Sequence, residues 1–100
     1  MNKHKSVDYQ SYLLESLRDP EEASLYLNEA LEEDDIKVFL LALKNIVQAN
    51  GGVAKLSEQA DKSRTSLYKT LSDKGNPYLK NIKELLSALN LHISVQPNHK

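Results

Sequence analysis

The sequence predicts an all-α protein of five or six short helices. Helix start and stop signals recur along its 100 residues, and apolar residues repeat at intervals of three and four. Strand-like alternation is confined to LHISV at 91–95. This length suits one domain, and a 40% hydrophobic content suffices for one core. We expect an N-terminal arm or short helix at 1–18, one helical domain at 19–95 and a tail at 96–100.

The first capped helix is expected to begin after Asp19. This aspartate can cap the helix, Pro20 suits the first helical position, and Glu22 suits the third. The apolar stripe that follows consists of Ala23, Tyr26, Leu27, Ala30 and Leu31. Upstream, YQSYLLESL at 9–17 is amphipathic but has no cap, so it is either a short helix or an arm that packs on the body.

The next helix is the strongest core-forming segment of the chain. Asp34 or Asp35 can cap it, and Asn50-Gly51-Gly52 ends it because these residues tolerate left-handed backbone. Its apolar stripe is Ile36, Phe39, Leu40, Leu43, Ile46 and Val47, widened by Val38 and Leu41.

Three shorter elements and a terminal segment complete the expected fold. A helix with Val53, Leu56 and Ala60 leads to a turn near Asp61, and Ser63 can cap a helix over 64–71. After loop-like residues 72–77, a last helix over about 80–89 would bury Ile82, Leu85, Leu86 and Leu89. A strand at 91–95 would need a second strand, which another copy of the chain could supply through Leu91, Ile93 and Val95.

The two helices over about 53–71 have the layout of a helix-turn-helix. Steeply crossing helices need small residues where they touch, and Ala54, Ser57 and Ala60 provide them. The turn of such a motif favours glycine for its positive φ, whereas this chain has Asp61.

The second helix of this pair would present donors for DNA. Arg64 can read guanine, Thr65 can hydrogen-bond or meet a thymine methyl, and Lys69 can support them. Lys62, Ser63 and Ser66 suit phosphates, with Lys74 and Lys80 as outlying contacts. Leu67 and Leu71 would be buried, with the Tyr68 ring packed beside them; the alternative is that the Tyr68 hydroxyl turns toward a phosphate. Residues 55–83 hold seven basic and three acidic residues, which fits a polyanion. A plain αα-hairpin with a solvated basic face fits the same pattern.

Charge is segregated along the chain, and no motif of enzymatic chemistry is present. Residues 1–35 hold three basic and ten acidic residues, whereas residues 36–100 hold ten basic and four acidic ones. There is no cysteine, and the three histidines have no ligand-like spacing, so no metal site or cofactor is expected. No catalytic residue is predicted, and the apolar runs are too short to span a membrane.

Beyond the motif, most of the chain resembles the addiction-module antidote family, the HigA-like antitoxins with an Xre-type helix-turn-helix. The resemblance covers about residues 9–95, and its most specific pieces are DPEEASLYLNEALEEDD, SLYKTLS and GNP followed by the last helix. It implies a lambda-repressor-like fold, a homodimer, binding to the double-stranded operator DNA of its own operon, and a small basic RelE/ParE-like toxin as partner. It also implies a bacterial cytoplasmic location.

Two departures from the family pattern and two alternative functions remain. Asp61 stands where glycine is favoured, and Lys80 stands where the family often has a capping acid or serine. Lys80 indicates either a later helix start, at a cap such as Asn81, or an added phosphate contact. A stand-alone Xre-type repressor would bind DNA without a toxin. A helical protein-interaction module would bind no DNA. The acidic segment 19–35 is a plausible surface for a basic partner.

Overall fold

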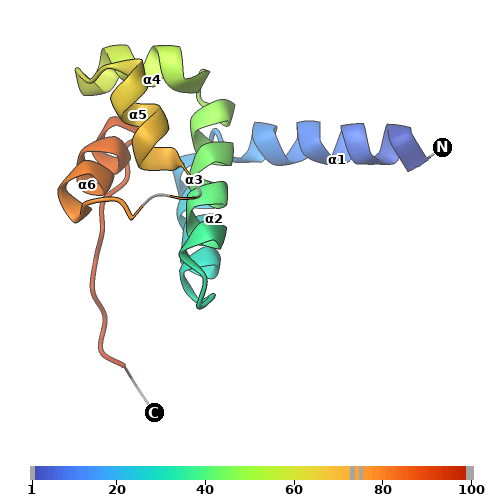
Figure 1. Ribbon diagram of the computed structural model, residues 1–100. Coiled ribbons are helices and arrows are strands. Elements are labelled where there is room, and N and C mark those ends of the chain that lie inside the picture. The colour runs from blue at the N-terminus through green and yellow to red at the C-terminus, as the bar shows by residue number, and fades with distance from the viewer. Residues whose placement is uncertain (1, 73, 75, 99–100) are drawn as a thin grey trace.

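The computed structural model describes residues 2–72, 74 and 76–98 and consists there of six helices without a strand (Figure 1). Parts of the expected loop (Asp73, Gly75) and the end of the tail (99–100) lie outside the described residues. The helices are α1 (Asn2–Ser16), α2 (Pro20–Leu31), α3 (Ile36–Ala49), α4 (Gly52–Ala60), α5 (Arg64–Leu71) and α6 (Leu79–Ala88). The all-α prediction is confirmed.

Predicted aspartate caps set the start of α2 and α3. The Asp19 carboxylate accepts a hydrogen bond from the Glu21 backbone N–H at 3.1 Å, and Asp35 accepts one from Lys37 at 2.9 Å. Gly51 has a φ of 108°, the left-handed backbone expected where α3 ends and α4 begins. By contrast, α6 begins at Leu79, close to the expected residue 80, after Tyr78, which makes no side-chain capping bond. The alternative of a later start capped by Asn81 is therefore wrong.

Helix α3 is the centre of the fold, because it contacts α1, α2, α4 and α5. Leu40 and Leu43 of α3 and Leu85 of α6 are completely buried. Helix α2 lies along α3, while α4, α5 and α6 gather on the other side (Figure 1). Three expected members of the α3 stripe are exposed instead: Val38 and Leu41 lie out of phase with the buried positions, and Ile36 lies at the first position of the helix.

Helix α1 projects away from the body and is attached mainly by its C-terminal end (Figure 1). Leu17 is buried, Leu13 is partly buried, and Tyr9 and Tyr12 are exposed. The Asn50 side-chain amide donates to the Leu17 carbonyl at 3.3 Å and so ties this end of the arm to the end of α3. Of the two alternatives for residues 9–17, a short helix or an arm, the structure shows the helix.

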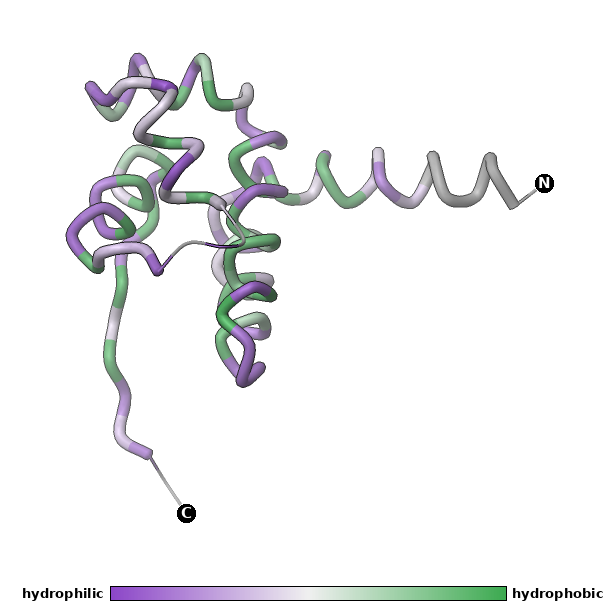
Figure 2. The backbone as a smooth tube through the Cα atoms, viewed as in Figure 1, coloured by the Kyte–Doolittle hydropathy of each residue, from purple (hydrophilic) through white to green (hydrophobic). Residues whose placement is uncertain are grey.

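The C-terminal tail is extended, and hydrophobic and hydrophilic residues alternate along it (Figure 2). Leu91 still packs against the core, and its backbone N–H donates to the Leu86 carbonyl at 2.8 Å. Residues 91–98 form no strand within this chain, because no described segment pairs with them and a strand needs a neighbour. The strand is absent from the single chain, and its formation between two copies stays a prediction.

Candidate nucleic-acid interface

The turn between α4 and α5 is three residues long, Asp61 to Ser63, and is held by hydrogen bonds back to α4. The Lys62 backbone N–H donates to the Ser57 carbonyl at 3.2 Å, and the Ser57 hydroxyl donates to the Lys62 carbonyl. Ser57 was expected only as a small residue at the crossing. It also fixes the path of the chain into α5.

Asp61 has the left-handed conformation that glycine favours, with φ 55° and ψ 48°. The sequence therefore identified the turn position correctly. Aspartate tolerates this conformation better than most residues because its short polar side chain can interact locally with the backbone. The turn is consequently formed without glycine, and the Asp61 side chain is exposed.

Ser63 caps α5 as predicted. Its hydroxyl oxygen accepts a hydrogen bond from the Ser66 backbone N–H at 3.0 Å, and its backbone is extended. The cap places Arg64 at the first position of the helix. The exposed N-terminus of a helix attracts anions, since its first backbone N–H groups lack partners within the helix.

The exposed side chains of α5 lie on one face. Arg64, Thr65 and Lys69 are all exposed, and Ser66 is half-buried. Tyr68 is 62% exposed, so the prediction that its ring packs inside is wrong. The physical reason is helical phase: Tyr68 lies four residues after Arg64 and joins the outward face.

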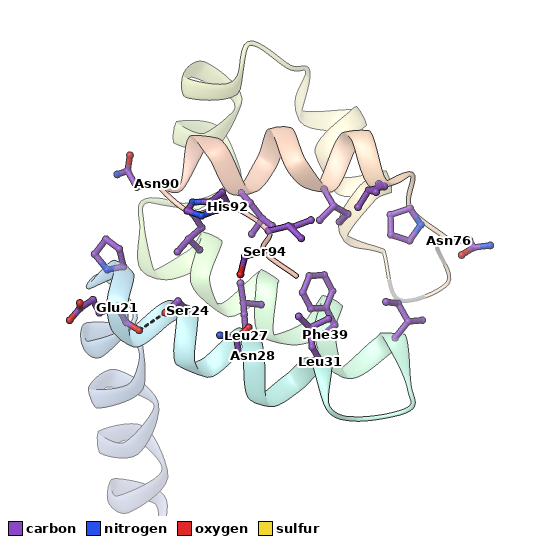
Figure 3. Close-up of a pocket in the computed structure, with 18 residues that line it drawn as sticks. Glu21, Ser24, Leu27, Asn28, Leu31, Phe39, Asn76, Asn90, His92 and Ser94 are labelled. Carbon is purple, nitrogen blue, oxygen red and sulfur yellow. Dashed lines mark hydrogen bonds between the residues drawn. The ribbon is translucent and has the colours of Figure 1, made fainter. Parts of the chain in front are cut away.

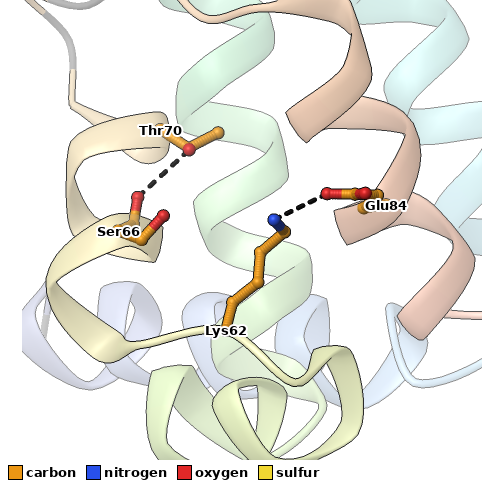
Figure 4. A network of polar contacts seen from close by, with 4 residues as sticks. All are labelled: Lys62, Ser66, Thr70 and Glu84. Carbon is orange, nitrogen blue, oxygen red and sulfur yellow. Dashed lines mark hydrogen bonds and ion pairs between the residues drawn. The ribbon is translucent and has the colours of Figure 1, made fainter.

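Thr70, which was not predicted to be buried, lies in the core beside Leu67 and Leu71. Its hydroxyl donates to the Ser66 carbonyl at 3.1 Å, one helical turn back (Figure 4). This bond satisfies the hydroxyl inside the core. The sequence signal for this burial is that Thr70 lies three residues after Leu67, on the same side of the helix.

Lys62 points from the turn toward α6, where its ammonium pairs with Glu84 (Figure 4). The distance from Lys62 Nζ to Glu84 Oε1 is 2.6 Å. The hydrogen bond from Lys62 lowers the pKa of the Glu84 carboxyl below its usual value, assisted by the charges of Lys62 and Lys80 and opposed by burial. This pair joins the turn to α6. Contact of Lys62 with a phosphate stays a prediction.

A small hollow of about 210 Å³ lies between α5 and the start of α6. It brings Ser66 and Lys69 of α5 together with Tyr78 and Asn81. The sequence analysis considered Asn81 only as a helix cap and did not place Tyr78 in the DNA-binding site. Both can hydrogen-bond, and they extend the polar surface beside α5.

The two outlying lysines are exposed. Lys74 lies in the connection to α6, where its backbone N–H donates to the Ser72 hydroxyl at 3.2 Å, and Lys80 is the second residue of α6. Within the described part of the chain, no group of three His, Cys, Asp or Glu side chains could hold a metal ion. Among the described helices, none is long and apolar enough to cross a membrane.

The fold defines a small all-helical protein with an α4–turn–α5 pair compatible with a helix-turn-helix. The model of a family described as probable addiction module antidote protein matches residues 5–97. The chain belongs to this antidote family, as the resemblance indicated. A Haemophilus influenzae protein (strain ATCC 51907 / DSM 11121 / KW20 / Rd), described as uncharacterized, is 43% identical over 82 residues, which cover 82% of this chain and 84% of that protein. No solved structure matches the chain.

Proposed function

We propose that the chain is the antitoxin of a type II toxin–antitoxin module, which neutralises a small basic RelE/ParE-like toxin and represses its own operon in the bacterial cytoplasm. Membership of the antidote family supports the antidote role and, in general, a toxin partner. Operator binding is supported by the structure of α5.

One observation carries the DNA-binding part of the proposal. Arg64, Thr65 and Lys69 are exposed together on α5, and that helix starts at a capped, hydrogen-bonded turn. Arg64 would read a guanine in the major groove, with Thr65 beside it. Ser63, Ser66 and Lys62 would meet the phosphates near the helix start, and Lys74 and Lys80 would make outlying contacts.

A lambda-repressor-like protein binds its operator as a dimer, and we propose the same for this chain. Two α5 helices would then enter successive major grooves about 34 Å apart. The extended tail suits the role of a dimer contact, since Ile93 and Val95 are exposed and none of the backbone N–H groups of residues 92–98 donates to another described residue. Leu91 would anchor this pairing to the core.

The first experiment measures binding of the chain to the DNA upstream of its own gene at several salt concentrations. Arg64→Ala should weaken binding by about 1–3 kcal/mol and relax base preference. Lys44→Ala is the matched control, because Lys44 is an exposed base on another helix, α3. If Arg64→Ala binds the operator as tightly as the unchanged chain, Arg64 does not read a base.

The second experiment concerns the toxin. The neighbouring gene should encode a short basic protein whose expression alone arrests growth, and co-expression of this chain should restore growth. A stand-alone repressor would have no such neighbour. A protein-interaction module would show no salt-dependent binding to duplex DNA.

A further inference from the structure

A groove of about 620 Å³ lies on a part of the molecule that the DNA proposal does not use (Figure 3). One wall is α2 with the start of α3, where Leu27, Leu31 and Phe39 point into the space. The opposite wall is α6 and the first residues of the tail. None of Arg64, Thr65 and Lys69 lines this groove.

The groove leaves apolar side chains in contact with solvent. Leu31 is 57% exposed, Ile36 49%, Leu79 65% and Ile93 44%, and all four line the same space. Leu31 and Ile36 continue the apolar stripes of α2 and α3, but they lie at the helix ends where no other element covers them. A contiguous exposed apolar surface of this kind marks a binding site more often than scattered leucines do.

The turn that joins these two groove residues is acidic, and we refer to it as the rim of the groove. Glu32, Glu33 and Asp34 are exposed in the turn that joins Leu31 to Ile36, and no lysine or arginine lines the groove. Carboxylates at the C-terminal end of α2 are unfavourable for that helix, because the end carries partial negative charge. The one ion pair among the described residues joins Lys62 to Glu84, so none of these carboxylates forms an ion pair with a described lysine or arginine.

We propose that this groove is the docking site for the toxin, and that it receives an amphipathic segment with an apolar face and Lys or Arg at the end beside the α2–α3 turn. The apolar face would cover Leu31, Ile36 and Leu79, and the basic end would neutralise Glu32, Glu33 and Asp34. Charge complementarity favours a basic partner over a second copy of this chain, whose own 19–35 segment is acidic. This inference rests on the proposed antitoxin function.

The test titrates the purified product of the neighbouring gene into the full chain. Leu31→Arg and Ile36→Arg should each weaken binding by at least about tenfold, because they place a cation in the apolar contact and repel the basic segment. Leu25→Arg and Leu41→Arg are matched controls on the same two helices, 64% and 58% exposed and outside the groove, and should bind within about twofold of the unchanged chain. Circular dichroism and operator binding verify that each variant is folded.

A second variant tests the rim without an apolar-to-charged change. The triple substitution Glu32→Gln, Glu33→Gln and Asp34→Asn should weaken binding of the neighbouring product and reduce its salt dependence, while the thermal stability of the chain stays the same or rises. A loss of stability with unchanged binding would assign these carboxylates a role inside the chain, and the rim would not be part of a docking site.

The outcomes separate the two proposals. If the unchanged chain does not bind the neighbouring product, the antitoxin function itself fails. If it binds, but Leu31→Arg and Ile36→Arg bind equally well, the groove is not the docking site and the antitoxin function stands. A change of oligomeric state in the groove variants, measured by light scattering, would instead assign the groove to a second copy and overturn the proposal. Weaker binding in the Leu25 and Leu41 variants alone would place the toxin on the outer face of α2 and α3.

Discussion

The face of α5 and the groove between α2 and α6 differ in chemistry and in how the chain builds them. The α5 face is polar and basic, and it comes from one continuous segment whose turn and cap are fixed by hydrogen bonds between near neighbours. The groove is apolar with an acidic rim, and it joins residues 20–39 to residues 76–94. Two faces so different suit two partners, a polyanion and a basic protein.

The faces are separate but share a boundary. Asn76 and Pro77 line both the groove and the small hollow beside α5. Both faces also depend on α3, which contacts α2 on one side and α4 and α5 on the other. Substitutions can therefore be chosen to damage both faces together or one face alone.

The largest effect is expected from Leu43→Ala, at a completely buried position of α3. It should lower the free energy of unfolding by about 2–5 kcal/mol, since the lost contacts and the cavity both cost stability. Operator binding and toxin binding should weaken together at a temperature where part of the chain is unfolded. Denaturant titration measures the change.

The control for this substitution is Leu41→Ala on the same helix, where the side chain is exposed. It should change stability by no more than about 0.5 kcal/mol. If the two variants are equally stable, α3 is not the common support of both faces.

The difference between the faces explains why one of them could be predicted from the sequence and the other could not. Signals close together in the chain predicted the α5 face: the cap at Ser63, the turn at Asp61 and the outward Arg64 and Lys69. The prediction for Tyr68 was wrong because it relied on the aromatic character of the residue. With Leu67 in the core, the helical phase places the Tyr68 side chain on the exposed face. Local pattern therefore suffices for a face built from one segment.

The groove could not be predicted in the same way. Leu31 and Ile36 fit the buried stripes of their helices. Only the packed structure shows that the C-terminal end of α2 and the N-terminal end of α3 leave these two side chains exposed. Which distant segments line one space depends on how α6 and the tail lie against the body. The acidic run at 32–35 was visible in the sequence, but its position on a groove was not.

A smaller effect, confined to the α5 face, is expected from Asp61→Gly. Glycine adopts the left-handed backbone at this position without the steric cost that aspartate bears, so the variant should be more stable by about 0.5–1 kcal/mol. Glu58→Gly, an exposed position within α4, is the control. It makes the same change of charge and adds the same glycine, but it should destabilise the chain by about 1 kcal/mol. Thermal denaturation distinguishes the two signs, and stabilisation by neither variant would mean that Asp61 bears no steric cost in the turn.

The smallest effect is expected at the ion pair that joins the turn to α6. The side chains of Lys62 and Glu84 are 24% and 41% exposed, so solvent screens much of their attraction. Because Lys62 lowers the pKa of the folded Glu84 carboxyl, the pair stabilises the fold above the unfolded pKa of about 4.3. That stability is lost as the pH falls through the still lower folded pKa, where the carboxyl is protonated in both states.

Glu84→Gln isolates this contribution. The unchanged chain should be slightly more stable than the variant at pH 7, and the difference should shrink as the pH falls below the unfolded pKa of about 4.3 and vanish below the lower folded pKa. In a Lys62→Gln background, the effect of Glu84→Gln on stability should depend much less on pH. The pH dependence that is left would come from the charge of Lys80. Thermal melts of the four proteins at several pH values close this double-mutant cycle. An equal pH dependence in both backgrounds would show that the turn and α6 are not coupled through Lys62, so that the orientation of α5 depends on the hydrogen bonds of Ser57 and on the core alone.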